Sequence, residues 1–230
     1  MTVSTVVLVH GACGTPAAWS RVVPLLDALG VPNVAVQLPS CIADSEVSDA
    51  DAMRSFLDER DGEGSVVLVG HSYGGMVLTE VGDHRAVARL VYLDAGMLDV
   101  GESLYTLLGP GFDERFSACM KVQGESSAFD PEELSAYLLS RGWSAADVRE
   151  RLPGLRSQRL GALVTVPTTA AWRTVPSTFI SCRDSEMNSD LRALFASRAT
   201  DVVEIEGDHF PNWLRPGEVA EIIAGIARDT

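Results

Sequence analysis

Ser72 is the serine of a Gly-x-Ser-x-Gly pattern at residues 70–74. An apolar run at 66–69 precedes the pattern, and a helix-compatible segment follows it. A serine on a sharp turn between a strand and a helix adopts a strained backbone conformation, which flanking glycines permit. The turn raises the hydroxyl above the strand end, and the N terminus of the helix faces any oxyanion formed there. Ser72 is therefore a candidate nucleophile.

A serine hydroxyl needs a neighbouring base, usually an imidazole that a carboxylate orients. The chain has four histidines. His10 ends the first apolar run, His71 lies inside the serine pattern, and His84 lies between charged residues at a predicted turn. His209 follows the last predicted strand, which agrees with the chain order serine, acid, histidine. We therefore predict that His209 is the general base.

Three carboxylates follow predicted strands and could orient His209. Asp184 and Glu186 come after a strand that ends at residue 182, and Asp94 ends an earlier strand at 89–93. Open α/β sheets place functional residues at the carboxyl ends of their strands. The residues alone leave all three open.

An oxyanion hole in such a site combines the N–H after the nucleophile with an N–H from the loop after the first strand. Here these groups belong to Tyr73 and Ala12. Gly11 lies in the same glycine-rich turn and leaves the hole open for a carbonyl oxygen. We predict that Gly11, Ala12 and Tyr73 contact the substrate.

Six apolar runs predict the strands that hold these residues, at 4–10, 33–38, 66–70, 89–93, 178–182 and 201–205. Amphipathic helical patterns alternate with them, which is typical of a doubly wound, mainly parallel α/β sheet. Residues 99–175 interrupt this alternation, with glycine and proline breaks at 109–111 and 153–154 and no good strand pattern. We expect a core of residues 1–98 and 176–230, with an inserted helical cap at 99–175.

Composition excludes several classes of protein. The chain has 230 residues, of which 46% are hydrophobic, and a net charge of −14 from 18 basic and 32 acidic residues. This balance argues against nucleic-acid binding, which needs a basic face. The four cysteines are widely spaced and form no metal or redox motif, so we expect free thiols. The apolar N-terminal run is too short for a signal sequence or membrane span, which predicts a cytoplasmic protein without a membrane partner.

Two motifs together resemble the α/β-hydrolase superfamily: residues 7–13 with Trp19 after them, and residues 70–75. Within it, the chain is similar to the plant methylesterase and hydroxynitrile lyase group and its bacterial esterase relatives. The resemblance implies a serine esterase or lactonase that cleaves a small, mostly apolar ester through an acyl-enzyme, without metal or cofactor. The family usually has one more residue between the strand cysteine and its acid. Counting back from Leu191 restores the family spacing and selects Asp184, with Glu186 second.

Two positions favour hydrolysis over the lyase branch of that group. The lyases have threonine after the first-strand histidine and lysine after the catalytic histidine, where this chain has Gly11 and Phe210. Two other functions stay open. One is a cofactor-free lyase or isomerase that uses His209 and Ser72 for proton transfer, and the other is a ligand-binding protein on a hydrolase scaffold.

Overall fold

The computed structural model describes residues 3–104, 106–107 and 112–230, so the predicted break at 109–111 lies outside the described part. All six apolar runs form strands of one parallel sheet, in the order β2-β1-β3-β4-β8-β9. The strands are β1 (Thr5–Val9), β2 (Asn33–Val36), β3 (Val66–His71), β4 (Val87–Leu93), β8 (Ser177–Cys182) and β9 (Asp201–Ile205). The predicted fold class is confirmed.

Helices cover both faces of this sheet, which is why its central strands are apolar throughout. In β1, Val7 and Val9 face the core under α2 (Asp49–Asp58), α3 (Gly74–Val81) and α9 (Ser189–Arg198). Val6 and Leu8 face the opposite core under α1 (Val23–Ala28) and α11 (Pro216–Asp229). The alternation follows from the two-residue repeat of a strand.

Helix starts follow the capping residues. The Ser48 hydroxyl accepts a hydrogen bond from the Asp51 N–H at the start of α2, and Asp130 caps α6 (Pro131–Ser140) in the same way. The predicted helix after residue 15 is divided into η1 (Pro16–Trp19) and α1. The remaining short helices are η2 (Pro39–Cys41), η3 (Leu152–Gly154), α8 (Leu160–Val164), η4 (Ala171–Arg173) and α10 (Pro211–Leu214).

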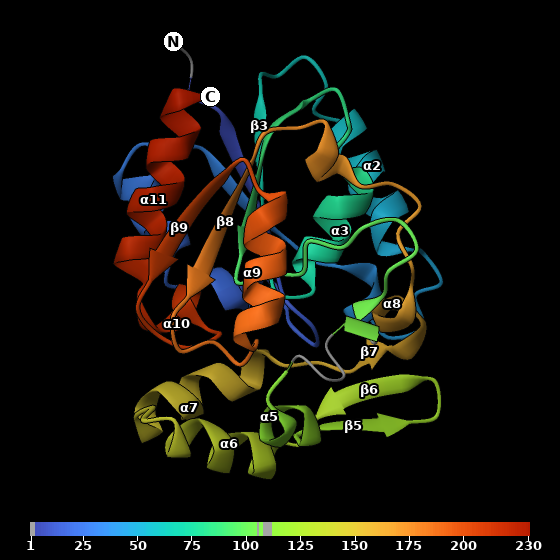
Figure 1. The fold of residues 1–230 in the computed structure, drawn as a ribbon, viewed down its shortest axis with the longest axis vertical. Coiled ribbons are helices and arrows are strands. Elements are labelled where there is room, and N and C mark those ends of the chain that lie inside the picture. The colour runs from blue at the N-terminus through green and yellow to red at the C-terminus, as the bar shows by residue number, and fades with distance from the viewer. Residues whose placement is uncertain (1–2, 105, 108–111) are drawn as a thin grey trace.

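The segment between β4 and β8 contains strands that we did not predict. Besides α5 (Glu114–Ala118), α6 and α7 (Ala145–Arg151), it forms an antiparallel sheet of β5 (Met120–Gln123), β6 (Ser126–Phe129) and β7 (Gln158–Arg159). These strands are too short and too polar to give a periodic signal. Helices α5 to α7 and strands β5 and β6 lie beyond the carboxyl ends of β8 and β9 (Figure 1). The boundaries of a separate cap at 99–175 stay a prediction.

Strand register brings the candidate residues to one edge of the sheet. Val9 pairs with Gly70, and His71 pairs with Leu93. The residues that follow these strands therefore emerge side by side, so Ser72 and Asp94 are neighbours.

No helix in the described part of the chain is long and apolar enough to cross a membrane. All four cysteines are buried and unpaired, which confirms the predicted free thiols.

The sheet predicts a large difference in stability between two identical substitutions. Val69 in β3 is fully buried, whereas Val202 in β9 is 51% exposed. Val69→Ala should lower the free energy of unfolding by about 2–4 kcal/mol, because it removes two buried methyl groups and leaves a cavity. Val202→Ala should cost less than about 1 kcal/mol. Urea denaturation measures both, and equal losses would contradict the assigned layers.

Candidate active site

Ser72 lies at the tip of a strained turn between β3 and α3. Its φ of 52° is in the left-handed region, which costs energy for a residue with a side chain. Two glycines allow the chain to close around it. A Cβ atom on Gly70 would lie 2.7 Å from the Gly74 carbonyl group, and a Cβ on Gly74 would lie 2.7 Å from the Val9 oxygen. The predicted turn is present.

The imidazole of His209 lies directly beside Ser72. Its Nε2 is 2.8 Å from the Ser72 Oγ, and its Nδ1 is 2.6 Å from Oδ2 of Asp94. Only 2% of His209 is exposed. Because the carboxylate only accepts, Nδ1 carries the proton and Nε2 can accept the serine proton. The structure therefore brings together the predicted nucleophile and the predicted base.

The carboxylate on His209 is Asp94, so the prediction that Asp184 orients the ring is wrong in this geometry. Asp94 directly follows β4 and is fully buried, with a φ of 43°. Its Oδ1 accepts a hydrogen bond from the Cys182 N–H at 3.2 Å, and its Oδ2 accepts one from the Ser185 hydroxyl at 2.6 Å. The loop after β8 thus supplies donors to the acid instead of the acid itself.

Asp184 and Glu186 have other places. The Asp184 side chain is exposed, and its N–H donates to the Gly207 carbonyl at 3.0 Å, which fixes the loop with this side chain outside. Glu186 is buried and accepts hydrogen bonds from the His209 N–H and the Tyr137 hydroxyl, both at 2.9 Å. Glu186 therefore holds the main chain of His209, while Asp94 holds its ring.

Opposing effects set the pKa of His209. Burial alone would lower it, but the hydrogen bond and negative charge of Asp94 raise it, and the charges of Glu186 and Asp208 add to this. The net shift is upward from the ordinary value of 6.5. The carboxylates therefore stabilise the imidazolium that forms when His209 takes a proton.

The other histidines do not share this role. His71 donates from Nε2 to the His209 carbonyl at 2.6 Å, and burial holds its pKa well below the usual range. His10 donates from Nδ1 to the Gly11 carbonyl, and burial lowers its pKa to about 4. Both rings stay neutral and shape the site. The Nε2 of His84 lies 3.1 Å from Oδ1 of the exposed Asp58, and His84 does not line the cavity that contains Ser72.

Two backbone N–H groups beside Ser72 are open, those of Ala12 and Tyr73. Both residues line the cavity, and neither N–H donates a hydrogen bond to another residue in the described part of the chain. Gly11 packs closely against His71 and Ser72. A Cβ on Gly11 would lie 3.0 Å from Nδ1 of His71 and 3.1 Å from the Cβ of Ser72. The three residues occupy the predicted positions for holding an oxyanion.

A buried hydrogen-bond network fixes the loop that contains Ala12. The Cys13 N–H donates to Gln158 at 2.8 Å, and the Gln158 amide donates to the Ser40 hydroxyl at 3.0 Å. The hydroxyls of Ser40 and Tyr73 both donate to Asp49, at 2.7 and 2.6 Å. Gln158 belongs to β7, so the inserted segment supports the loop that contains Ala12 and Cys13, which we call the oxyanion loop. Sequence reasoning missed this contact because 145 residues separate Cys13 from Gln158.

Ser72 opens into a cavity of about 400 Å³. Its walls are mainly apolar and aromatic, with Phe112, Phe116, Trp143 and Phe210 among them. Arg151 also lines this cavity. Sequence reasoning missed Arg151, although its position three residues after Val148 places both on the buried face of α7. Within the described residues, no group of three or more histidine, cysteine or acidic side chains could hold a metal ion.

Comparison with known sequences agrees with this architecture. Residues 6–222 match the model of the Alpha/beta hydrolase family. The alpha/beta hydrolase nvfD of Aspergillus novofumigatus is 28% identical over 242 residues, which cover 96% of each chain. Methylesterase 2 of Arabidopsis thaliana is 26% identical and covers 96% of this chain and 95% of its own.

Solved structures share the fold. A pyrethroid hydrolase from Sphingobium faniae JZ-2 superposes with a TM-score of 0.79 at 24% identity, covering 98% of each chain. The methylesterase MES16 from Arabidopsis has a TM-score of 0.76 at 21% identity, covering 99% of this chain and all of that one. The match over almost the whole sequence, on a parallel sheet with a serine at the turn after β3, shows that the chain belongs to the alpha/beta hydrolase family.

Proposed function

We propose that this protein is a serine hydrolase that cleaves carboxylic esters, with Ser72 as nucleophile, His209 as base and Asp94 as acid. The observation that carries the proposal is the hydrogen-bonded chain from Asp94 through His209 to Ser72, which ends in an apolar cavity. Relatives named as methylesterases support ester chemistry. Acyl transfer needs a nucleophile, a base and an oxyanion hole, and the site offers a residue for each.

In the first half of the reaction, the Ser72 Oγ attacks the ester carbonyl carbon while its proton moves to Nε2 of His209. The carbonyl oxygen becomes an oxyanion beside the N–H groups of Ala12 and Tyr73. Collapse of this intermediate breaks the bond to the alcohol oxygen, which takes the proton from His209. An acyl-enzyme and free alcohol result.

In the second half, His209 takes a proton from water as the water oxygen attacks the acyl carbon. Collapse of the second intermediate returns the proton to Ser72 and releases the carboxylic acid. Asp94 stays ionised throughout and keeps the Nδ1 proton of His209 in place. The size and apolar walls of the cavity favour a small, mostly apolar ester, either open-chain or lactone.

Ser72→Ala tests the nucleophile. It should lower turnover of a p-nitrophenyl ester by about 10⁴ to 10⁶, because no acyl-enzyme can form. In the wild type, rapid mixing should show a burst of nitrophenol, and intact-protein mass spectrometry should find one acyl group on Ser72. A lyase, an isomerase or a binding protein on this scaffold would form no acyl-enzyme. More than a tenth of wild-type turnover in Ser72→Ala would exclude this mechanism.

Asp94→Asn tests the acid through rate and pH dependence. It should lower kcat by about 10² to 10⁴, since amide hydrogen bonds favour the wrong tautomer of His209. In the wild type, kcat/KM should fall with decreasing pH around an apparent pKa above 6.5, because protonated His209 cannot accept a proton. Asp94→Asn removes the interactions that raise this pKa, so the acid limb should move to lower pH.

Asp184→Asn is the matched control for the acid, because it makes the same change on an exposed carboxylate. Its kcat should stay within threefold of the wild type, and its acid limb should not move. A severe loss in Asp184→Asn with an active Asp94→Asn would return the acid role to Asp184.

Gly11→Ala tests the space around the oxyanion hole. The added methyl group meets His71 and Ser72 at about 3 Å, so it should displace the nucleophile and lower kcat by tenfold or more. Gly225→Ala is the control, because its Cβ has no neighbour within 4 Å in helix α11. Gly225→Ala should keep full activity and a Tm at least as high as the wild type. Full activity in Gly11→Ala would show that this close packing has no role in catalysis.

A further inference from the structure

Arg151 is a buried cation in the wall of the catalytic cavity. It is the last residue of α7, and only 7% of it is exposed. It is the only lysine or arginine among the described residues that line the cavity with Ser72. Burial lowers its pKa to about 10, so the guanidinium stays charged at neutral pH. The mainly apolar wall of the catalytic cavity therefore carries one fixed positive charge, besides the Asp94 carboxylate that is hydrogen-bonded to His209.

This charge has no partner of its own. In the described part of the chain, the Arg151 side chain forms no hydrogen bond and no ion pair. The acidic residues beside it on α7 are engaged elsewhere, because Asp147 and Glu150 both pair with Nη2 of Arg21, at 2.8 and 2.6 Å. Arg151 is left between the rings of Phe210 and Trp213, each 5.8 Å from its guanidinium carbon.

Aromatic rings compensate only part of the cost of such a group. A desolvated cation–π contact contributes up to about 2 kcal/mol, whereas burying an ion costs several kcal/mol. Buried charges in proteins are normally paired, and an unpaired one in a ligand cavity points to a charge on the ligand. The planar guanidinium matches a carboxylate, which it can bind through two parallel hydrogen bonds.

Ser127 also borders this cavity, but its hydroxyl oxygen is almost completely covered by protein and cannot reach a ligand. It lies beside Cys13, because the Ser127 carbonyl accepts a hydrogen bond from the Cys13 Sγ at 3.6 Å. Recognition of an anion in this wall therefore falls to Arg151.

We propose that Arg151 forms a carboxylate-binding subsite, so that the preferred substrate is an ester that also carries a free carboxylate. This inference rests on the proposed esterase function. The carboxylate accepts hydrogen bonds from the guanidinium, while the ester carbonyl lies at Ser72. The subsite selects the substrate and takes no part in bond cleavage.

On this proposal, the anion binds Arg151 from the side of the catalytic cavity. Arg151 also borders a separate cavity of about 260 Å³, whose wall contains Glu150 and Arg156. Ser72, His209 and Asp94 do not line that second cavity, so an anion bound there could not belong to an ester held at Ser72. The acidic surface of the chain has little effect inside either cavity, since salt screens exposed charges beyond about 8 Å.

Matched substrates test the subsite. The monomethyl esters of succinic to suberic acid vary the distance between ester and carboxylate, and the corresponding methyl ester amides replace the carboxylate by a neutral group of the same shape. Methanol release at pH 7.5 gives kcat/KM for each. The wild type should prefer the acid over the amide by at least tenfold at one or more chain lengths, the effect of a charge-assisted hydrogen bond.

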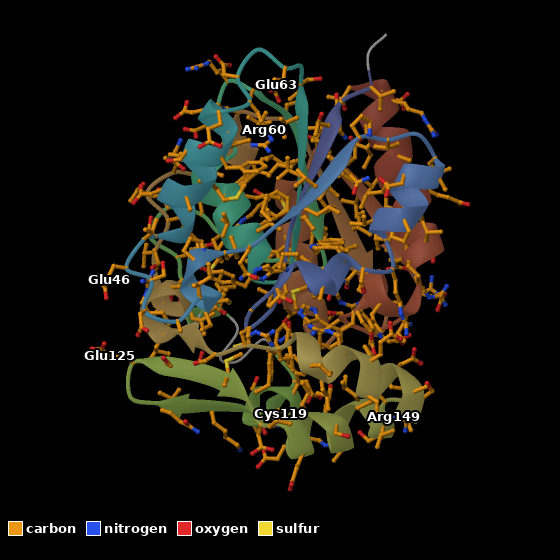
Figure 2. All side chains as sticks on the ribbon, turned by 180° about the vertical axis from the view of Figure 1, so that it is seen from behind. Glu46, Arg60, Glu63, Cys119, Glu125 and Arg149 are labelled. Carbon is orange, nitrogen blue, oxygen red and sulfur yellow. The ribbon has the colours of Figure 1, made fainter. Side chains whose placement is uncertain are left out.

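Three variants separate recognition from folding. Arg151→Met should lower kcat/KM for the preferred acid by about tenfold to a hundredfold and for its amide by less than threefold. Ser127→Ala should change kcat/KM for neither the acid nor the amide, because the covered hydroxyl does not reach the ligand. Arg149→Met is the control, because Arg149 is an exposed residue of the same helix on the outside of the molecule (Figure 2). Its loss should leave kcat/KM unchanged for both the acid and the amide. The Tm of Arg151→Met should equal or exceed that of the wild type, since an unpaired buried charge is removed.

Different outcomes would contradict different parts of the proposal. Equal losses for acid and amide in Arg151→Met, with a lowered Tm, would show that Arg151 is only structural. Hydrolysis of the amides without any preference for the acids would overturn the subsite and leave the esterase function intact. If neither series is hydrolysed, the esterase function fails, and 10 mM hexanoate tests the subsite alone. Hexanoate should raise the Tm of the wild type but not that of Arg151→Met, and no shift would overturn the subsite.

Discussion

The buried imidazole of His209 is the group on which the candidate site depends, because every polar group of this residue is engaged. Its Nδ1 donates to Asp94 and its Nε2 accepts from Ser72. Its N–H donates to Glu186, and its carbonyl accepts from His71. These partners come from the ends of three neighbouring parallel strands, so the sheet register sets the tautomer and the orientation of the ring. A shift of any one strand would leave a buried polar group unpaired, at a cost of about 1–3 kcal/mol.

Backbone strain is concentrated in the same place. Among the described residues, four that are not glycine have a φ in the left-handed region, and three of these are Cys13, Ser72 and Asp94. Such conformations cost about 1–3 kcal/mol each and persist only where surrounding structure enforces them. The enforcing contacts are visible here. The Asp94 N–H donates to the Ile180 carbonyl at 2.8 Å, and the Cys13 N–H donates to Gln158. The stability of the large apolar core is thus partly used to hold Ser72, Asp94 and the loop that contains Ala12 in position.

The sheet, the turn at Ser72 and the position of His209 could be predicted from the sequence, because each has a local signal. Apolar runs mark strands that are buried on both faces, and Gly-x-Ser-x-Gly after such a run marks the turn. The acid has no such signal. Asp94 and Asp184 both follow strands, and the choice depends on which side chain turns inward. Strand pairing decides it, because His71 and Leu93 end in register and place Asp94 beside Ser72, whereas the pairing of Asp184 with Gly207 leaves its side chain in solvent. The three short strands of the inserted segment and the isolation of Arg151 likewise arise only from tertiary contacts.

The low polarity of the cavity links the catalytic groups to Arg151. In an apolar surrounding, the N–H groups of Ala12 and Tyr73 interact more strongly with a developing negative charge than they would in water. The same surrounding makes an unpaired guanidinium unfavourable when the cavity contains no anion. Buried charges in proteins are normally paired, but the acids nearest to Arg151 in sequence, Asp147 and Glu150, are held by Arg21. The apolar walls that favour the proposed acyl transfer would therefore also make a carboxylate on the substrate a strong determinant of binding.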